Sequence, residues 1–132
     1  MGRCWTFRAF RETQTGPNVI DEWLGDIPAG IRTKFRAIVA HLAGSPDLGR
    51  PYFDKLKGYD NLYEVIVKAQ MQHRILACLG PGPKEVTLLI GATKSGASRG
   101  KPAKWFPKNA REIADARSKL PLHKRGYTDE YC

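Results

Sequence analysis

Two periods of apolar residues organise the first third of the chain. Residues 5–10 alternate apolar with other side chains, which is the pattern of a half-buried strand. Residues 19–25 carry apolar side chains at helical spacing, and residues 31–42 form a second apolar stripe that starts after Pro28 and stops before Gly44. The sequence therefore predicts one strand followed by two short helices that form a hairpin.

Three further strands are predicted in the middle of the chain. Residues 62–67, 74–79 and 85–91 are short runs of mostly apolar and β-branched residues. Residues 80–83, Gly-Pro-Gly-Pro, separate the last two runs and predict a tight reversal. Because such short connections join strands that run in opposite directions, we expect antiparallel neighbours.

The last third is predicted to hold one helix. Residues 95–104 are rich in Gly, Ser and basic side chains and are expected to be mobile, whereas Pro107 can begin a helix. The order of elements predicts an α+β fold: a small, mainly antiparallel sheet with the N-terminal helical hairpin on one face, and a C-terminal helix. We expect a single domain over residues 1–120 and a flexible C-terminal tail over residues 121–132.

The chain is strongly basic. Its formal net charge is +9, and residues 99–125 hold nine Lys and Arg side chains against Glu112 and Asp115. A basic face raises the local concentration of polyanions and speeds encounter with them. Charge alone does not distinguish messenger RNA from ribosomal RNA, DNA or an acidic protein, and a merely well-solvated basic surface also accounts for it.

The cysteines form no metal-binding motif. Cys4, Cys78 and Cys132 are odd in number and far apart, with no Cys-x-x-Cys pair and no His near enough in the sequence to suggest a zinc site. We therefore expect free thiols, no metal and no other cofactor. Since no stretch approaches the ~18 apolar residues of a membrane span, the sequence predicts a cytoplasmic protein without a membrane partner.

Basic side chains stand near the ends of the predicted strands. Lys94 follows the last central strand, and Arg74 begins the strand before it. Lys55 and Lys57 occupy a predicted turn ahead of the first central strand. We expect these positions to converge on a basic concavity of the sheet that suits a phosphate backbone.

Alternatives remain open for several of these side chains. Arg74 can instead pair across the sheet with Glu64 or Glu85. His73 is a base near neutral pH, but strand alternation puts it on the face opposite Arg74, which favours packing over catalysis. Residues 105–106, Trp-Phe, either stack on a base of single-stranded RNA or pack the last helix onto the sheet.

Several short motifs also follow one another in a distinctive order. They are Gly16-Pro-Asn-Val-Ile-Asp-Glu-Trp-Leu24, Pro28 with the basic amphipathic helix after it, residues 42–51, Leu56-Lys-Gly58, Leu62-Tyr-Glu64, His73-Arg-Ile-Leu76, residues 88–94 and residues 107–116. In this order and spacing the chain resembles the RelE/HigB superfamily of toxins, specifically its phage-derived HigB-like branch. The resemblance runs from about residue 5 to residue 119 and implies a RelE-like fold.

The resemblance also implies an activity and partners. Similar proteins enter the ribosomal A site, cut messenger RNA without a metal ion, and are blocked by a helix-turn-helix antitoxin of the HigA-like kind. In such cleavage the 2′-hydroxyl attacks the adjacent phosphate, so the site must help to deprotonate it, stabilise the phosphorane and protonate the leaving 5′-oxygen. The implied function is a ribosome-dependent endoribonuclease, the toxin of a type II toxin-antitoxin system.

Carried over by position, the resemblance assigns roles to individual side chains. It implies catalytic roles for Arg74, Lys94 and Lys57. The side chains expected to bind RNA are Lys55, Arg99, Lys101 and Lys104. His73 stands where the family usually has an aromatic residue and is a further candidate base.

Two positions depart from the family pattern. The family commonly reads Leu-Tyr-Glu-Leu-Arg where this chain ends the motif in Ile66, and has two lysines where this chain has Lys94 followed by Ser95. These departures leave a second function open. It is a non-catalytic RelE-like module of phage origin that binds RNA or receives a partner peptide.

Overall fold

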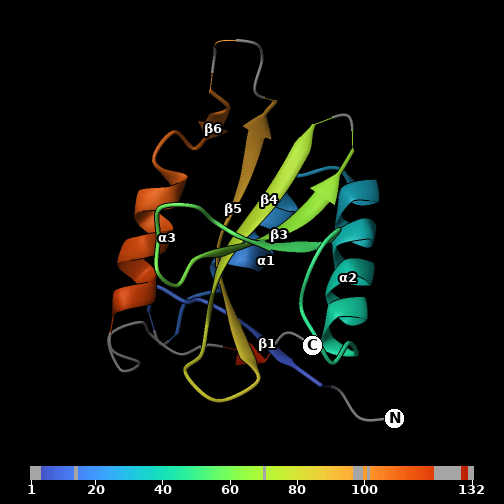
Figure 1. The fold of residues 1–132 in the computed structure, drawn as a ribbon, viewed down its shortest axis with the longest axis vertical. Helices are drawn as coiled ribbons and strands as arrows, with labels where there is room; N and C mark the ends of the chain where they lie inside the picture. Colours follow the sequence, from blue (N-terminus) through green and yellow to red (C-terminus); the bar gives the residue numbers. More distant parts are fainter. Residues whose placement is uncertain are drawn as a thin grey trace.

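The computed structural model describes residues 4–13, 15–69, 71–96, 100, 102–120 and 129–130. Its elements are β1 (Thr6–Ala9), α1 (Val19–Gly25), α2 (Ala29–Ala43), β2 (Phe53–Lys55), β3 (Tyr63–Lys68), β4 (Gln72–Leu79), β5 (Glu85–Ser95), β6 (Lys104–Phe106), α3 (Ala110–Lys119) and β7 (Asp129–Glu130). Figure 1 shows the sheet between α2 and α3. The predicted α+β fold, with a helical pair on one face and a C-terminal helix, is confirmed.

One sheet runs through the molecule. Its strand order is β2-β3-β4-β5-β1-β7, and β6 joins it by pairing with β5. Strands β2 to β5 are antiparallel neighbours, whereas β1 runs parallel to β5. Since β4 occupies one edge of β5, the other edge is shared: β1 pairs with residues 85–88 and β6 with residues 93–95. The second half of β5 and β6 thus form a ribbon that extends past β1 (Figure 1).

The larger apolar core lies between the sheet and the helices α1 and α2. Apolar residues of α2 recur every three or four positions, so they line one side of the helix and are buried together. They are Phe35, Ile38, Val39 and Leu42. From the sheet, Phe7, Val65 and Ile75 meet them, and all three are fully buried.

A smaller cluster fills the opposite face under α3. Ala110 and Ala114 are fully buried there against Leu76 and Leu89. Alanine leaves little distance between a helix axis and the sheet, so α3 lies close to β4 and β5. Arg117 fixes the helix further, because its Nη1 donates to the backbone carbonyl of Leu89 at 2.6 Å.

Local signals set the helix ends. Asn18 caps α1, since its side chain accepts a hydrogen bond from the backbone N–H of Asp21 at 2.7 Å. Pro28 precedes α2 and Gly44 follows it, as the sequence predicted. The helices are short, and within the described ranges none combines the length and apolar character needed to cross a membrane.

The structure adds three short strands to those predicted, β2, β6 and the two-residue β7. β2 and β6 have three residues each, and a run of that length carries no periodic signal that would distinguish it from a loop. β5 also continues to Ser95, beyond the predicted end at residue 91. Both ends of the segment that was predicted to be mobile are therefore ordered. Ser95 at the end of β5 pairs with Lys104 at the start of β6.

The predicted tail falls mostly outside the described residues. Residues 121–128 and 131–132 are not described. Residues 129–130 form β7, which pairs antiparallel with β1. The last described residues of the chain thus lie beside its first strand.

Gly91 marks the closest approach of β5 to α1. A Cβ atom at this position would lie 2.1 Å from Cδ2 of Trp23, so any other residue must displace the indole. Trp23 in turn lies edge-on against Phe35, with 6.3 Å between ring centroids. The missing side chain therefore lets α1 lie directly on the sheet.

Replacing Gly91 by Ala is predicted to lower the free energy of unfolding by about 1–3 kcal/mol, because the methyl group overpacks the Trp23 site. Gly30→Ala is the matched control. Gly30 lies in α2 with no atom within 4 Å of an added Cβ, so alanine should stabilise the helix by up to ~1 kcal/mol. Urea unfolding followed by circular dichroism measures both. Wild-type stability in Gly91→Ala would show that the indole does not rest on this strand.

Candidate functional site

The register of the sheet places Lys94 in a row of side chains that crosses four strands. Gln72 on β4 lies opposite Lys68 on β3 and Lys94 on β5, and Lys94 lies opposite Trp105 on β6. Directly paired residues point to the same face of a sheet. We call Lys68, Gln72, Lys94 and Trp105 the cross-strand row. Alternation along β4 puts Arg74 on this face as well, two residues further along.

The row lies on the face that α3 covers, beside the start of that helix. Trp105 packs against the cluster under α3, and Arg111 in the first turn of α3 reaches the same indole. Lys94 Nζ is 5.2 Å and Arg111 Cζ is 5.7 Å from the centroid of the Trp105 ring. Lys68 is exposed at the other end of the row. Three cations and one aromatic ring are thus grouped at this end of the sheet.

Arg111 has an unsatisfied polar atom at this place. Its Nε is buried and has no hydrogen-bond partner among the described residues. Lys94 and Arg111 are also like charges against one indole, and each is attracted to the ring by about 0.5–2 kcal/mol. An anion placed between them would relieve their repulsion. The arrangement therefore suits a phosphate group.

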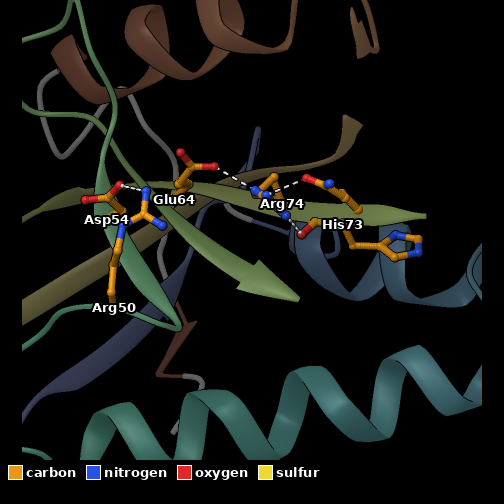
Figure 2. Close-up of polar contacts among 6 residues, drawn as sticks. Arg50, Asp54, Glu64, His73 and Arg74 are labelled. Atoms are coloured by element: carbon orange, nitrogen blue, oxygen red, sulfur yellow. Dashed lines mark hydrogen bonds and ion pairs between the residues drawn. The ribbon is translucent and has the colours of Figure 1, made fainter. Parts of the chain in front are cut away.

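Arg74 donates one hydrogen bond from each of the three nitrogens of its guanidinium. Its Nε donates to Glu64 Oε1 at 2.7 Å, Nη2 to Gln72 Oε1 at 2.7 Å, and Nη1 to the carbonyl oxygen of His73 at 3.1 Å (Figure 2). The side chains of Arg74 and Glu64 are only 8% and 9% exposed. The ion pair left open by the sequence is thus formed with Glu64, whereas Glu85 pairs with Arg8. Three of the five N–H groups of Arg74 are used in this way.

Lys55 and Lys57 do not lie at this end of the sheet. Lys55 lies opposite Tyr63, at the start of β3, whereas Lys68 of the row is at the end of β3. That separation is about 16 Å along the strand, and β2 is three strands from β5, about 14 Å across the sheet. The expected convergence of this turn on Lys94 is therefore not observed.

Both lysines of the turn have other surroundings. Lys55 Nζ donates to the carbonyl oxygens of Tyr59 and Asp60 at 2.6 and 3.0 Å, which closes the turn on itself. Lys57 is exposed after β2. Any contact of Lys57 with RNA would be made several nucleotides away from a phosphate bound at Lys94.

The expected RNA-binding linker is described only in part. Arg99 and Lys101 lie outside the described residues. Lys104 is exposed on β6, and its backbone N–H donates to Ser95 Oγ at 3.1 Å. Alternation along β6 turns its side chain away from that of Trp105.

His73 lies on the opposite face of the sheet, as its position next to Arg74 predicted. Its ring meets Trp23 edge-on, with 6.1 Å between centroids, and the residue is only 5% exposed. Figure 2 shows the imidazole directed away from the guanidinium of Arg74. His73 therefore does not face a phosphate bound at the cross-strand row.

Sequence reasoning did not single out Lys68 or Arg111. Lys68 could have been found by alternation along its strand. It is two residues from Ile66 and four from Glu64, so all three side chains point to the face that carries Arg74. The signal for Arg111 was its place in the first turn of a helix that begins just after Trp105. Within the described part of the chain, no three His, Cys, Asp or Glu side chains gather as a metal site would require.

Breaking the buried ion pair is predicted to cost much more than breaking the exposed pair beside it. Glu64→Ala or Arg74→Ala leaves one buried charge without its partner and should lower the free energy of unfolding by about 3–5 kcal/mol. Arg50→Ala is the matched control. Arg50 pairs with Asp54 at 2.6 Å but is 72% exposed, so its loss should stay within about 1 kcal/mol. Urea denaturation compares the two pairs, and equal losses would contradict the burial of Glu64 and Arg74.

The pKa of His73 is lowered from its ordinary value of 6.5, first by burial and then by the charge of Arg74. As the pH falls through that value the unfolded chain takes up a proton before the folded protein does. The stability that neutral His73 contributes is therefore full above its ordinary pKa and is lost progressively at lower pH. Between about pH 7 and pH 5, His73→Gln should lose less stability than the wild type. Urea unfolding at both pH values measures the difference.

The exposed His41 provides the control for this titration. His41→Gln also removes one imidazole, but from an exposed position on α2, and should leave the wild-type loss of stability between the two pH values unchanged. An equal loss in the wild type and in His73→Gln would show that folding does not hinder protonation of His73.

Comparison with known proteins identifies a family. The family model described as phage derived protein Gp49-like (DUF891) matches residues 22–119. No curated protein and no solved structure matches the chain. The matched residues extend from α1 to the end of α3, so they contain the cross-strand row, Arg74 and Arg111. The chain therefore belongs to the Gp49-like family of phage-derived proteins.

Proposed function

We propose that this protein is the toxin of a type II toxin-antitoxin system and cleaves messenger RNA on the ribosome without a metal ion. The observation that carries the proposal is the grouping of Lys94 and Arg111 on the indole of Trp105, with Lys68 in the same cross-strand row. Stacking of a base on an aromatic ring contributes about 1–3 kcal/mol and does not require one particular base. A nucleotide stacked on Trp105 would bring its phosphate to the two cations.

The proposed chemistry follows from these positions. As the 2′-oxygen attacks, negative charge develops on the phosphorane, and Lys94 and Arg111 stabilise it at short range. Lys94 also carries a proton that the leaving 5′-oxygen can take. No side chain of the cross-strand row is a base, so the proton of the attacking hydroxyl passes to water or to a ribosomal group.

Arg74 has a supporting role in this proposal. Two of its N–H groups remain for a phosphate after those that bind Glu64, Gln72 and the His73 carbonyl. Its charge is balanced by Glu64, so it orients the phosphate more than it attracts it. The linker residues Arg99 and Lys101 are proposed to contact the RNA backbone further along. Lys104 would do so only from the other side of β6, because its side chain points away from Trp105.

The proposed partners follow from the same face. The ribosome with its messenger RNA presents the polyanion, and a helix-turn-helix antitoxin would inhibit the toxin by laying an acidic segment over Lys94 and Arg111. Expression without that antitoxin should then arrest growth. The proposal places the protein in the cytoplasm, where translation occurs.

A second function is favoured by one feature of the core. Ile66 lies opposite Arg74 and is only 4% exposed, at the position where the sequence pattern of similar toxins has an arginine. Ile66 contributes no positive charge at this position, and the charge of Arg74 is balanced by Glu64. Fewer cationic side chains are therefore available to a phosphate bound at the cross-strand row. The second candidate is therefore a non-catalytic module that binds RNA through the same row.

Induced expression in a bacterial host, read by growth and by the 5′ ends of cellular messenger RNA, tests the proposal. The wild type should arrest growth and produce new in-frame ends, and Lys94→Ala or Arg111→Ala should lower cleavage by about 100-fold. The matched control is Arg36→Ala, an exposed arginine on α2, which should cleave like the wild type.

Three other results would change the assignment. If Lys57→Ala abolishes cleavage while Lys94→Ala does not, the active site lies at the opposite end of the sheet. Normal growth with intact messenger RNA, from protein shown to be folded, would reject the endoribonuclease. RNA binding by that protein, weakened in Lys94→Ala and Arg111→Ala, would then support the second candidate.

A further inference from the structure

A groove opens on the face of the sheet opposite to the cross-strand row. Its volume is about 640 Å³, and its apolar walls come from segments far apart in the sequence. They include Trp23 of α1, Ile27 shortly after that helix, Met71 between β3 and β4, and Phe106 on β6. The ribbon of β5 and β6 forms one side of the groove, and α1 forms the other.

Two large apolar side chains are exposed at the rim of the groove. Met71 is 59% exposed and Phe106 is 76% exposed, and within the described ranges they are the two large hydrophobic residues that are exposed. Both line this one groove. Exposed apolar side chains that gather around a concavity are typical of an interaction site.

A buried polar group faces the same groove. His73 is 5% exposed, and its Nδ1 has no hydrogen-bond partner among the described residues. His73 is one of the residues that line the groove. A buried nitrogen without a partner is unusual in a folded protein, and a hydrogen bond from a bound group would satisfy it.

The rim is acidic although the protein is basic. Glu22 and Asp26 line the groove, and α1 contains no Lys or Arg. The one basic side chain in the lining, Arg117, is already bonded to Glu12 and to the carbonyl of Leu89. A chain with net charge +9 thus presents negative charge beside its exposed apolar side chains.

We propose that this groove docks a segment of a partner protein that carries a large apolar side chain flanked by Lys or Arg. The apolar side chain would fill the space between Phe106, Met71 and Trp23, and the basic side chains would lie beside Glu22 and Asp26. Charge complementarity selects this occupant, because an acidic segment would be repelled from the rim. The groove is on the other face from Lys94, so RNA and this partner can be bound together.

A peptide pair of opposite charge tests the groove directly. The probe is a short fluorescein-labelled peptide with one Phe and one Leu flanked by lysines, and the comparison peptide has Glu in place of each Lys. Fluorescence anisotropy measures binding to the full chain at physiological salt. The net charge favours the Glu peptide over long range, so only a local site would prefer the Lys peptide. We expect the Lys peptide to bind about 10-fold more tightly.

Variants then locate the binding. Phe106→Ser, and Glu22→Gln combined with Asp26→Asn, should each weaken binding of the Lys peptide by about 10-fold. These side chains are exposed, so the variants should keep the wild-type melting temperature. The matched control is Glu112→Gln, an exposed carboxylate in the first turn of α3, which should leave binding unchanged.

Methyl NMR gives an independent readout. The chain has two methionines, and Met71→Leu assigns the methyl signal of Met71. That signal should move on addition of the Lys peptide and stay in place on addition of the Glu peptide. Equal or tighter binding of the Glu peptide, or unchanged binding by Phe106→Ser, would overturn the proposal. A concentration-dependent dimer that Phe106→Ser abolishes would assign the groove to a second copy of this chain and would also overturn it.

Discussion

The arrangement of the molecule depends on the pairing of β5. This strand holds β4 along one edge for most of its length, and on the other edge it holds β1 first and β6 afterwards. Its faces carry the helices: Gly91 admits the indole of Trp23 from α1, and the carbonyl of Leu89 accepts from Arg117 of α3. A shift of β5 by one residue would exchange the side chains of its two faces. The register of this strand therefore fixes Lys94 on the face of Trp105 and Arg111.

The buried ion pair of Arg74 and Glu64 explains how charge is arranged on that face. Removing two charges from water is costly, and a buried pair seldom adds net stability over apolar residues of similar size. The pair nevertheless gives the guanidinium one fixed position, bonded also to Gln72 and to a backbone carbonyl. Since the pair is neutral as a whole, the positive potential at this end of the sheet arises from Lys68, Lys94 and Arg111 at its rim. Geometry and charge are thus supplied by different residues.

The sequence was sufficient for the elements that bury a periodic face. Both helices of the hairpin and the three central strands follow from spacing, and the opposite orientations of His73 and Arg74 follow from alternation. The sequence was insufficient where the register of strand pairing decides which side chains lie together. Lys55 and Lys94 both stand near strand ends, but which ends of the strands coincide depends on the pairing of β2 with β3 and of β4 with β5.

The site residues that sequence reasoning missed have the same origin. Lys68 enters the site through the pairing of β3 with β4 and of β4 with β5. Arg111 enters it because β6, a three-residue strand without a sequence signal, brings Trp105 next to Lys94. The ordering of that strand is a tertiary effect: the linker pairs because β5 extends beyond β1 and offers an open edge. Local composition, rich in Gly, Ser and basic residues, predicted mobility for the same segment.

The ribbon formed by β5 and β6 separates two surfaces of opposite character. On one side, Lys94 and Trp105 contribute to a cationic, aromatic face, and on the other, Phe106 borders an apolar groove with an acidic rim. Adjacent residues of one short strand, Trp105 and Phe106, thus serve different surfaces because alternation turns them to opposite faces. A group bound at Phe106 and a phosphate bound beside Trp105 would therefore lie against adjacent residues of one strand, on opposite faces of the sheet.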